Sequence, residues 1–562
     1  MKKGVINMTK RGAAAKKSFI KKPGRILISF LVTLVFGLTY FFFSLPAINF
    51  QEPALYAFLS LLPVVYAATN IYLSGRFRTP ASRSDPKAIG KFLLSASIVP
   101  IIIVSGLLLV YLIGNLVSAP IFRAKTYSQL LAFDTGEFLA DVQEISFDQI
   151  PMLDKDSAVR LGDRKLGELS DMVSQFEVSA NYSQINFQNR PVRVTYLQYG
   201  DVIKWLNNRS KGLPAYIIVD MVTQNAEVIR VPEGIKYSPS EPIFRNLTRY
   251  LRFQYPTTMF GDPVFEIDEE GTPYWVCPKI VKTVGLFGGT TIDGAVLLNA
   301  VTGESQYYLA TEVPGWVDRV YSADLITDQY NYYGKYNKGF FNSILGQRDV
   351  TVTTAGYNYI AMNDDVFMYT GVTSVGSDES NIGFLLVNQR TKDATFYSIA
   401  GAEEFSAMNS AQGLVQDLRY TATFPLLLNI AGEPTYFMAL KDGAGLVKMF
   451  AMVHVQYYQN AVTGATLAEC EERYKALLRK NEPTEIQTLT TVTGSLSEIR
   501  TAVIGGNSYY YLRLGEDPFY YVISAANSEV AVILNVADHV EIAAIDVDGD
   551  LRRASSVARR ED

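Results

Sequence analysis

The chain has 562 residues, of which 48% are apolar and 19% are charged, a composition that excludes wholesale disorder. The net charge of −5 is unevenly divided: residues 1–120 hold 14 Lys/Arg and two acids, a charge of +12, so residues 121–562 carry −17. An acidic body argues against nucleic acid as a partner, because binding a polyanion requires cationic groups.

Three long uncharged apolar runs lie in the first fifth of the chain, at 26–43, 54–73 and 92–117. About 20 helical residues cross the hydrocarbon core of a bilayer, and a charge inside it costs at least a few kcal/mol. We therefore expect a basic N-terminus at 1–25 and a three-helix transmembrane anchor at 26–120. A signal peptide cleaved near Ile48 is the rival interpretation, which the two later runs disfavour.

The charges of the connecting segments predict the orientation of the anchor. Nine Lys/Arg precede the first run, none lies in 44–53, and five lie in 74–91. By the positive-inside rule the N-terminus is cytoplasmic and the residues after about 120 are extracytoplasmic. This pattern predicts a multi-pass protein of the cell membrane, with membrane lipid as its first partner.

The segment that follows the anchor, 121–195, is mixed helical and polar. Helices are expected over 125–139 and 159–176. We interpret it as an extracytoplasmic helical collar that joins the third span to the body.

Four segments of the body share an apolar run followed by Asp or Asn, two further residues and Thr. The pairs are Asp220 with Thr223, Asn299 with Thr302, Asn388 with Thr391, and Asn460 with Thr463. An Asx side chain closes a turn by accepting a hydrogen bond from the amide two residues on, and Gly303 and Gly464 suit a turn position with positive φ. The pattern predicts four β-hairpins; four ligand-binding Asx/Thr pairs are the alternative.

Helical periodicity separates these hairpins. The expected helices are 239–253, 316–326, 403–418 and 467–479. Each unit therefore consists of a helix and a short antiparallel sheet whose apolar face the helix covers. The fold class is membrane plus α+β.

This arrangement resembles the PepSY family of bacterial extracytoplasmic domains. The closest segment is 274–308, in which Asn299, Thr302 and Gly303 occupy the turn positions of the family's motif. The resemblance covers 198–479 and implies tandem PepSY/cystatin-like units, two in 196–310 and two in 311–480. It implies binding or regulatory modules, some of them inhibitory toward proteases, without catalytic residues.

Short strands return after residue 482. They are expected at 487–492, 500–503, 508–514, 519–523, 530–534 and 540–545, with turns at 505–507 and 515–518. We expect a small β-barrel over 483–546, OB-like in strand number, and a solvated charged tail at 547–562. Five tyrosines could form a stacking surface or could be core and face residues of the barrel: Tyr509, Tyr510, Tyr511, Tyr520 and Tyr521.

We expect no catalytic, cofactor-binding or metal-ligating residues, because the sequence contains no motif typical of them. The acidic run 546–550 fails the calcium-loop spacing, and 285–289 is interpreted as a loop between strands. The acidic clusters Asp364-Asp365 and Asp268-Glu269-Glu270 are interpreted as solvated turns. Cys277 and Cys470 form one disulfide or, as we favour, are two separate buried residues.

We therefore predict a membrane-anchored, non-enzymatic extracytoplasmic binding, scaffold or regulatory protein of the bacterial cell envelope. Its partner is expected to be another envelope protein or a wall polymer. Two alternatives stay open. An envelope hydrolase acting on wall glycan or peptide predicts acids or His454 converging in a cleft with perturbed pKa values. An accessory subunit of a membrane transporter predicts spans that pack against a partner.

Overall fold

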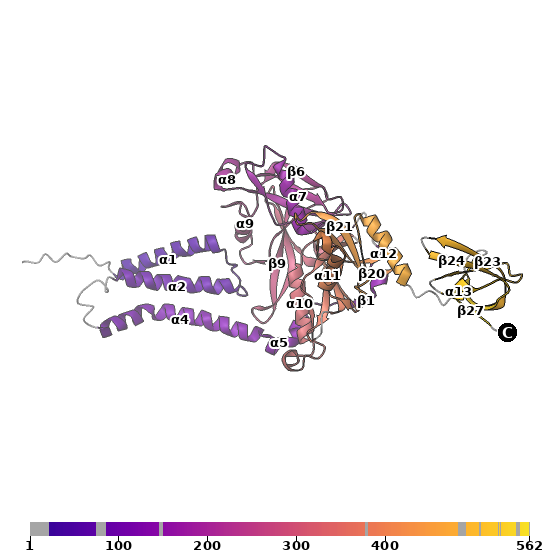
Figure 1. Cartoon of the computed structure of the whole chain (residues 1–562). Helices are drawn as coiled ribbons and strands as arrows, with labels where there is room; N and C mark the ends of the chain where they lie inside the picture. Colours follow the sequence, from indigo (N-terminus) through magenta and orange to yellow (C-terminus); the bar gives the residue numbers. More distant parts are fainter. Residues whose placement is uncertain are drawn as a thin grey trace, which may run out of the picture. The chain divides into compact units, whose positions relative to one another are not determined.

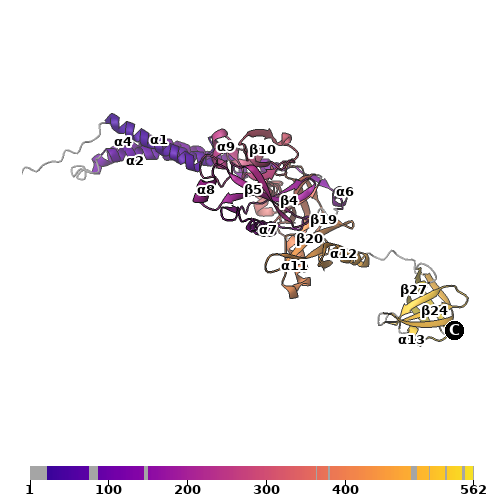
Figure 2. The ribbon, with the colours of Figure 1, turned by 90° about the horizontal axis from the view of Figure 1, so that it is seen from above.

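The computed structural model describes residues 22–74, 86–144, 150–362, 364–376, 380–481, 490–504, 507–525, 528, 530–546 and 551–560. The chain divides into two compact units, Met1–Tyr474 and Lys475–Asp562 (Figures 1 and 2). Most of the basic residues that predict the orientation of the anchor lie outside the described residues, as do residues 547–550 of the acidic run and two residues of the turn at 505–507.

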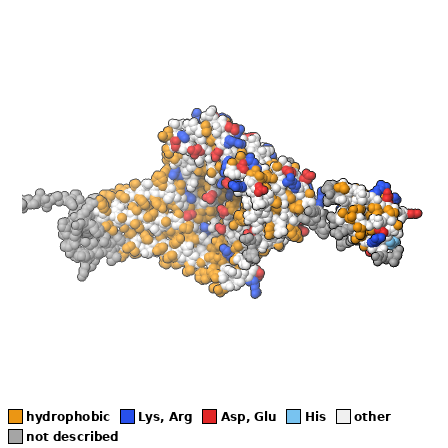
Figure 3. All heavy atoms as spheres, in the orientation of Figure 1, with side chains coloured by type: hydrophobic (Ala, Val, Ile, Leu, Met, Phe, Trp, Pro, Cys, Tyr) orange, Lys and Arg blue, Asp and Glu red, His pale blue; other side chains and the backbone are white. Residues whose placement is uncertain are grey.

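Within the described ranges, three helices are long and apolar enough to cross a membrane. They are α1 (Lys22–Ser44), α2 (Pro53–Leu73) and α4 (Pro86–Ser118). Glu52 caps α2, accepting a hydrogen bond from the amide of Ala54 at 3.2 Å. Apolar side chains dominate the surface of these helices, whereas charged side chains gather on the body (Figure 3). The three predicted apolar helices are confirmed.

Four sheets in the described part of the first unit share one plan. A helix is followed by a short strand and then by a meander of four antiparallel strands, and the short strand pairs with the second strand of the meander. The first consists of α7 (Lys155–Gly167), β2 (Phe176–Val178), β3 (Ser183–Phe187), β4 (Arg190–Tyr199), β5 (Leu213–Asp220) and β6 (Ala226–Ile235). The second consists of α9 (Leu247–Gln254), β7 (Met259–Phe260), β8 (Val264–Ile267), β9 (Pro273–Val284), β10 (Gly288–Asn299) and β11 (Ser305–Leu309).

The third and fourth sheets follow the same order. The third consists of α10 (Ala323–Tyr336), β12 (Thr351–Thr353), β13 (Asn358–Met362), β14 (Asp365–Ser374), β15 (Ser380–Asn388) and β16 (Ala394–Tyr397), extended by β1 (Asp134–Gly136) and β17 (Gly401–Ala402). The fourth consists of α11 (Glu404–Leu414), β18 (Thr421–Ala422), β19 (Leu426–Ile430), β20 (Glu433–Lys441), β21 (Val447–His454) and β22 (Ala461–Gly464). The shorter helices precede the first sheet or connect elements within and between the sheets. They are α5 (Pro120–Tyr127), α6 (Phe138–Asp141), α8 (Val202–Asn208), η3 (Ala310–Glu312), η4 (Asn342–Gly346) and η5 (Gln416–Leu418).

The predicted boundaries of the collar and of two helices are wrong in this unit. The collar does not reach residue 195, because α7 and strands β2 to β4 belong to the first sheet. The first helix and its sheet therefore begin near residue 155 instead of 196. The helices predicted at 239–253 and 316–326 are displaced toward the C-terminus, to α9 and α10, because the residues before them form turns.

The sheet that contains β9 and β10 is buried on both faces. Trp275 and Cys277 belong to a core shared with the first sheet, whereas the intervening Val276 belongs to a core shared with α10 and the third sheet. Neighbouring residues separate in this way because successive side chains of a strand point to opposite faces. Cys277 of β9 and Cys470 of α12 (Leu467–Asn481) are both buried, and they do not form a disulfide.

The predicted Asx turns are confirmed at three of the four sites. The Oδ1 atoms of Asp220, Asn299 and Asn388 each accept hydrogen bonds from the backbone amides two and three residues on, at 2.8–3.0 Å. The turn residues Gln224, Gly303 and Lys392 have positive φ, so this position does not require glycine.

The fourth turn is anchored by His454, and the prediction for Asn460 is wrong. β21 ends at His454, and its Nδ1 accepts from the amides of Gln456 and Tyr457 at 3.1 and 3.2 Å. The loop is one residue longer than in the other sheets, since the His454 amide donates to Asn460 O, six residues on. Gly464 accordingly lies in β22 and not in the turn.

The second unit contains a closed five-stranded barrel. Its strands are β23 (Thr490–Ile504), β24 (Asn507–Leu514), β25 (Tyr520–Ser524), β26 (His539–Asp546) and β27 (Leu551–Arg559), in the order β23-β24-β25-β27-β26. The predicted barrel is confirmed, with two corrections. Residues 551–559 close the barrel instead of forming a solvated tail, and 530–533 form a short helix, α13 (Val530–Ile533), instead of a strand.

Candidate functional site

A cleft of about 700 Å³ lies between the first two sheets and the segment that leads into α10. Its inner wall is aromatic: the ring centroids of Tyr196 and Trp275 lie 4.9 Å apart, and those of Phe265 and Trp275 lie 5.3 Å apart. Trp275 Nε1 donates to the backbone oxygen of Tyr237 at 2.8 Å, which satisfies the only polar atom of the indole. These buried rings hold the two sheets together and form a rigid wall.

The rest of the lining mixes apolar and polar side chains. It includes the carboxylates of Asp262, Asp324 and Asp328 and the cations of Lys155 and Arg319. Asp324 and Asp328 lie one turn apart on α10, where i and i+4 side chains are neighbours. Burial and the charge of Asp324 raise the pKa of Asp328, against the opposing effect of Lys335. This lining suits a polar ligand.

Behind the aromatic wall lies a buried pair of carboxyl groups, Glu266 and Asp318. Glu266 follows Phe265 on β8 and therefore points away from the cleft; its exposed fraction is 0%, and that of Asp318 is 1%. The Asp318 amide donates to Glu266 Oε2 at 2.9 Å, and the Asn186 amide donates to Asp318 Oδ2 at 2.7 Å. The other carboxyl oxygen of each residue has no hydrogen-bond partner among the described residues.

Both buried groups favour the protonated form. Burial raises the pKa of Glu266 to about 8, although hydrogen bonds from the backbone and the charge of Arg319 oppose the shift. Burial and the charge of Glu266 raise the pKa of Asp318 well above its usual range. Desolvation and like charge act in the same direction in such a pair. We call Glu266, Asp318 and Asn186 the carboxyl junction.

The β9–β10 hairpin connects the cleft to the membrane helices. Ile280, Thr290 and Ile292 of this hairpin line the cleft, while the amides of Leu286 and Phe287 at its tip donate to Ser118 Oγ, at the end of α4, at 2.9 and 3.0 Å. The single hairpin therefore contacts the candidate ligand site and the end of the third span.

The tip is fitted closely between two spans. The Phe287 ring lies 5.6 Å from the Tyr56 ring of α2 and 5.4 Å from the Tyr111 ring of α4. A Cβ at Gly114 would lie 2.4 Å from the Phe287 ring, and one at Gly285, whose φ is +63°, would lie 2.5 Å from Ser118 Oγ. Side chains at either glycine would separate the hairpin from the spans.

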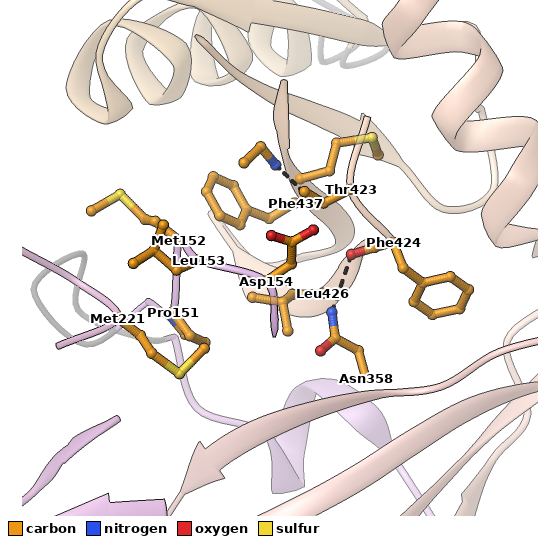
Figure 4. Close-up of a pocket in the computed structure, with 12 residues that line it drawn as sticks. Pro151, Met152, Leu153, Asp154, Met221, Asn358, Thr423, Phe424, Leu426 and Phe437 are labelled. Atoms are coloured by element: carbon orange, nitrogen blue, oxygen red, sulfur yellow. Dashed lines mark hydrogen bonds between the residues drawn. The ribbon is translucent and has the colours of Figure 1, made fainter. Parts of the chain in front are cut away.

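A second cavity, drawn in Figure 4, is too small for a ligand. It has a volume of about 20 Å³, room for roughly one water molecule. It lies where residues 151–154 meet the third and fourth sheets, and Asn358 Nδ2 donates there to Phe424 O at 3.1 Å. Asp154 forms an ion pair with Lys441 and accepts from the Ser157 amide at the start of α7. This cavity is a packing gap where residues 151–154 contact the third and fourth sheets.

The acidic clusters noted in the sequence have structural roles. Asp268 Oδ1 accepts from the amides of Glu270 and Thr272, as expected of a turn. The prediction of a solvated turn is wrong for Asp365, which is buried and makes two hydrogen bonds to Arg390, at 2.6 and 2.7 Å. The 285–289 loop connects two strands as predicted, and its contact with α4 does not follow from the sequence pattern.

Two of the five barrel tyrosines make contacts within the barrel. Tyr521 is fully buried and donates to Asp517 Oδ2 at 2.7 Å. The guanidinium groups of Arg500 and Arg513 lie 5.4 and 5.5 Å from the centre of the Tyr520 ring. These contacts favour the core and face interpretation of both residues.

The residues of the carboxyl junction were missed by the sequence analysis. Glu266 stands in an otherwise apolar strand, and a charged residue at such a position is the one signal that could have flagged it. Asp318 lies in a segment without regular structure, and the pairing joins positions 52 residues apart. Local patterns do not reveal such a contact.

Comparisons with known proteins leave the family undetermined. No family model matches the chain, and no curated protein matches it. Among solved structures, an ancestral GH74 enzyme is 10% identical with a TM-score of 0.15, and the match covers 60% of this chain and 40% of that enzyme. A TM-score this low carries no argument about fold or activity.

Proposed function

We propose that this chain is a membrane-anchored, non-enzymatic binding protein of the bacterial cell envelope, with a body on the extracytoplasmic side that binds a polar ligand in the cleft. The observation that carries the proposal is the cleft itself: about 700 Å³ lies within the range of small-molecule and peptide sites. A rigid aromatic wall and a charged lining are the features such sites combine.

The charges of the lining favour a ligand with a cationic group. Three exposed carboxylates, Asp262, Asp324 and Asp328, face two cations, Lys155 and Arg319. The raised pKa of Asp328 reflects burial and repulsion by Asp324. A bound ammonium or guanidinium group would relieve that repulsion. An amine-bearing peptide of the envelope has the required chemistry.

The β9–β10 hairpin supports a regulatory role for the binding. Ligand contact at Ile280 or Thr290 acts on the same two strands whose tip packs on Ser118 and Tyr111. A paired hairpin is stiff along its strands. Binding in the cleft is therefore placed to alter the packing of α2 and α4.

We further propose that the four sheets are divergent copies of one PepSY-like unit and that the barrel is OB-like. The shared order of helix, short strand and meander supports the first part, although each unit has five strands where the PepSY pattern has three. A closed five-stranded barrel with a helix between its third and fourth strands supports the second.

Photo-cross-linking in intact cells tests the binding function. A photoreactive amino acid replaces Thr248, an exposed residue that lines the cleft, and in a control replaces Leu418, an exposed residue of η5. We expect an adduct only from position 248, with a several-fold lower yield when Asp324→Asn and Asp328→Asn are combined. Equal yields from both positions would contradict the proposal. A ligand recovered in cleaved form would favour the hydrolase instead.

A further inference from the structure

Exposed apolar side chains lie beside the last turn of the first span. Phe244 is 74% exposed and Phe253 is 55% exposed. The Phe244 ring lies 6.2 Å from the Phe42 ring, and the Phe253 ring lies 6.1 Å from the Phe41 ring. Phe41 and Phe42 lie near the C-terminal end of the apolar helix α1, so a membrane crossed by α1 would end close to their partners in the body.

Two arginines of α9 hold the body against the end of α1 through hydrogen bonds. Arg249 of α9 is buried, its Nε donates to Phe42 O at 3.1 Å, and its guanidinium carbon lies 4.1 Å from the centre of the Phe42 ring. Arg252 Nε donates to Leu45 O at 3.0 Å. These arginines satisfy carbonyl groups that the end of α1 leaves without helical partners. The level of the body relative to the end of α1 is thereby set.

Helix α8 is tied to the same region and is apolar on its outer side. Trp205 Nε1 donates to the buried Glu241 at 2.8 Å, and Arg245 donates to Arg209 O at 3.0 Å. While Trp205 packs inward, three other residues of α8 are turned to the surface: Val202 is 64% exposed, Ile203 is 71% exposed and Leu206 is 48% exposed.

We propose that these residues form a membrane-contacting shelf, made of Val202, Ile203, Leu206, Ile243, Phe244 and Phe253, that inserts into the headgroup–acyl boundary of the leaflet on the side of the body. The occupant is lipid because the shelf continues the surface of α1 through ring contacts at Phe41 and Phe42. α8 and α9 lie on the part of the body nearest the three helices (Figures 1 and 2).

Physical chemistry favours this occupant. Six large apolar side chains exposed at the surface are unfavourable in water and favourable in the acyl region, at about 25 cal/mol per Å² of apolar surface. The exposed cations Arg209 and Lys211 follow α8 directly, the flanking pattern that anionic headgroups attract. The shelf is separate from the proposed ligand site. It would set the orientation of the body relative to the bilayer.

Depth-dependent fluorescence quenching tests the shelf. Ile203→Cys is labelled with an environment-sensitive fluorophore in the full chain, which is reconstituted into phosphatidylcholine–phosphatidylglycerol vesicles. The native thiols of Cys277 and Cys470 are buried and do not compete for the label. Lipids carrying a nitroxide near the headgroup or near the bilayer centre serve as quenchers, and Leu414→Cys, an exposed leucine of α11, is the matched control.

We expect the headgroup-proximal nitroxide to quench the label at position 203 several-fold more than the label at position 414, and more than the deep nitroxide does. A label at Val202→Cys gives a second reading if the first variant folds poorly. Quenching equal to that of the control overturns the proposal. Protection from both lipid and aqueous quenchers also overturns it, because a protein, such as a second copy of the chain, would then cover the shelf.

Discussion

The backbone amide of Asp318 donates a hydrogen bond to Glu266 Oε2 across 2.9 Å, joining the segment before α10 to strand β8. Two carboxyl groups meet there without solvent, and both pKa values are raised. The junction lies directly behind the wall of the cleft, since Phe265 and Arg319, the sequence neighbours of these two residues, line it. A change in the protonation of the junction would therefore act next to two residues that line the cleft.

The stability of the first unit should fall as pH rises through the titration of Glu266. An unfolded glutamate ionises near pH 4.3, whereas folded Glu266 has a pKa of about 8. Between these values the folded state binds the extra proton, so the free energy of unfolding decreases with rising pH. Glu266→Gln should remove part of this decrease, on the order of a few kcal/mol.

Thermal unfolding of the detergent-solubilised chain across this pH window measures the effect of Glu266→Gln. Glu269→Gln, which alters an exposed carboxylate in the turn between β8 and β9, is the control. It should keep the pH dependence of stability of the parent chain. An unchanged slope in Glu266→Gln would show that the junction stays ionised in the folded state.

The contact between the hairpin tip and the spans should depend on Gly114. Gly114→Ala places a Cβ 2.4 Å from the Phe287 ring, and overpacking of this kind costs about 1–3 kcal/mol. The amides of Leu286 and Phe287, which donate to Ser118 Oγ, should then exchange hydrogen faster. Gly106→Ala is the matched control on the same helix, because no atom lies within 4 Å of its added Cβ. Equal exchange in both variants would contradict this contact.

The turn at His454 should weaken in acid. Burial lowers the pKa of His454, although Glu433 opposes the shift. Protonation of Nδ1 would remove the acceptor for the amides of Gln456 and Tyr457. Above about pH 6.5 an unfolded histidine is neutral, and the turn contributes fully to stability. This contribution is lost as the pH falls below 6.5 and through the lowered pKa of folded His454.

His454→Asn separates the hydrogen bonds from the titration. Asparagine anchors the corresponding turns at Asn299 and Asn388, so this variant should keep the fold and lose the acid sensitivity. His454→Leu lacks the acceptor and should be destabilised by about 1 kcal/mol or more at neutral pH. Chemical denaturation above and below pH 6.5 distinguishes the parent chain, His454→Asn and His454→Leu. If the stability of the parent chain and of His454→Asn changed with pH in parallel, His454 would not be the source of the acid sensitivity.

The proposed orientation predicts which cysteines a membrane-impermeant maleimide reaches in whole cells. Burial raises the pKa of Cys470 to about 12, and Cys277 is buried too, so the parent chain should not react. Leu414→Cys should react in intact cells, whereas Ser84→Cys, in the basic connection before the third span, should react only after lysis. The reverse pattern would place the body in the cytoplasm.

The sequence by itself determined the features that depend on local chemistry. The three spans follow from runs without charge, because lipid excludes charged side chains whatever the rest of the chain does. The turns at Asp220, Asn299 and Asn388 follow from a side chain that bonds its own neighbouring amides. The barrel follows from short strands that repeat with turns between them.

Only the tertiary structure decided the contacts between distant residues. His454 replaces Asn460 as a turn anchor because strand register, set by pairing with β20, ends β21 at that histidine. Phe287 meets Tyr56, and Asp318 meets Glu266, across long stretches of chain. Such contacts depend on how separate sheets and helices pack, and packing involves surfaces assembled from many segments, which no local pattern of residues encodes.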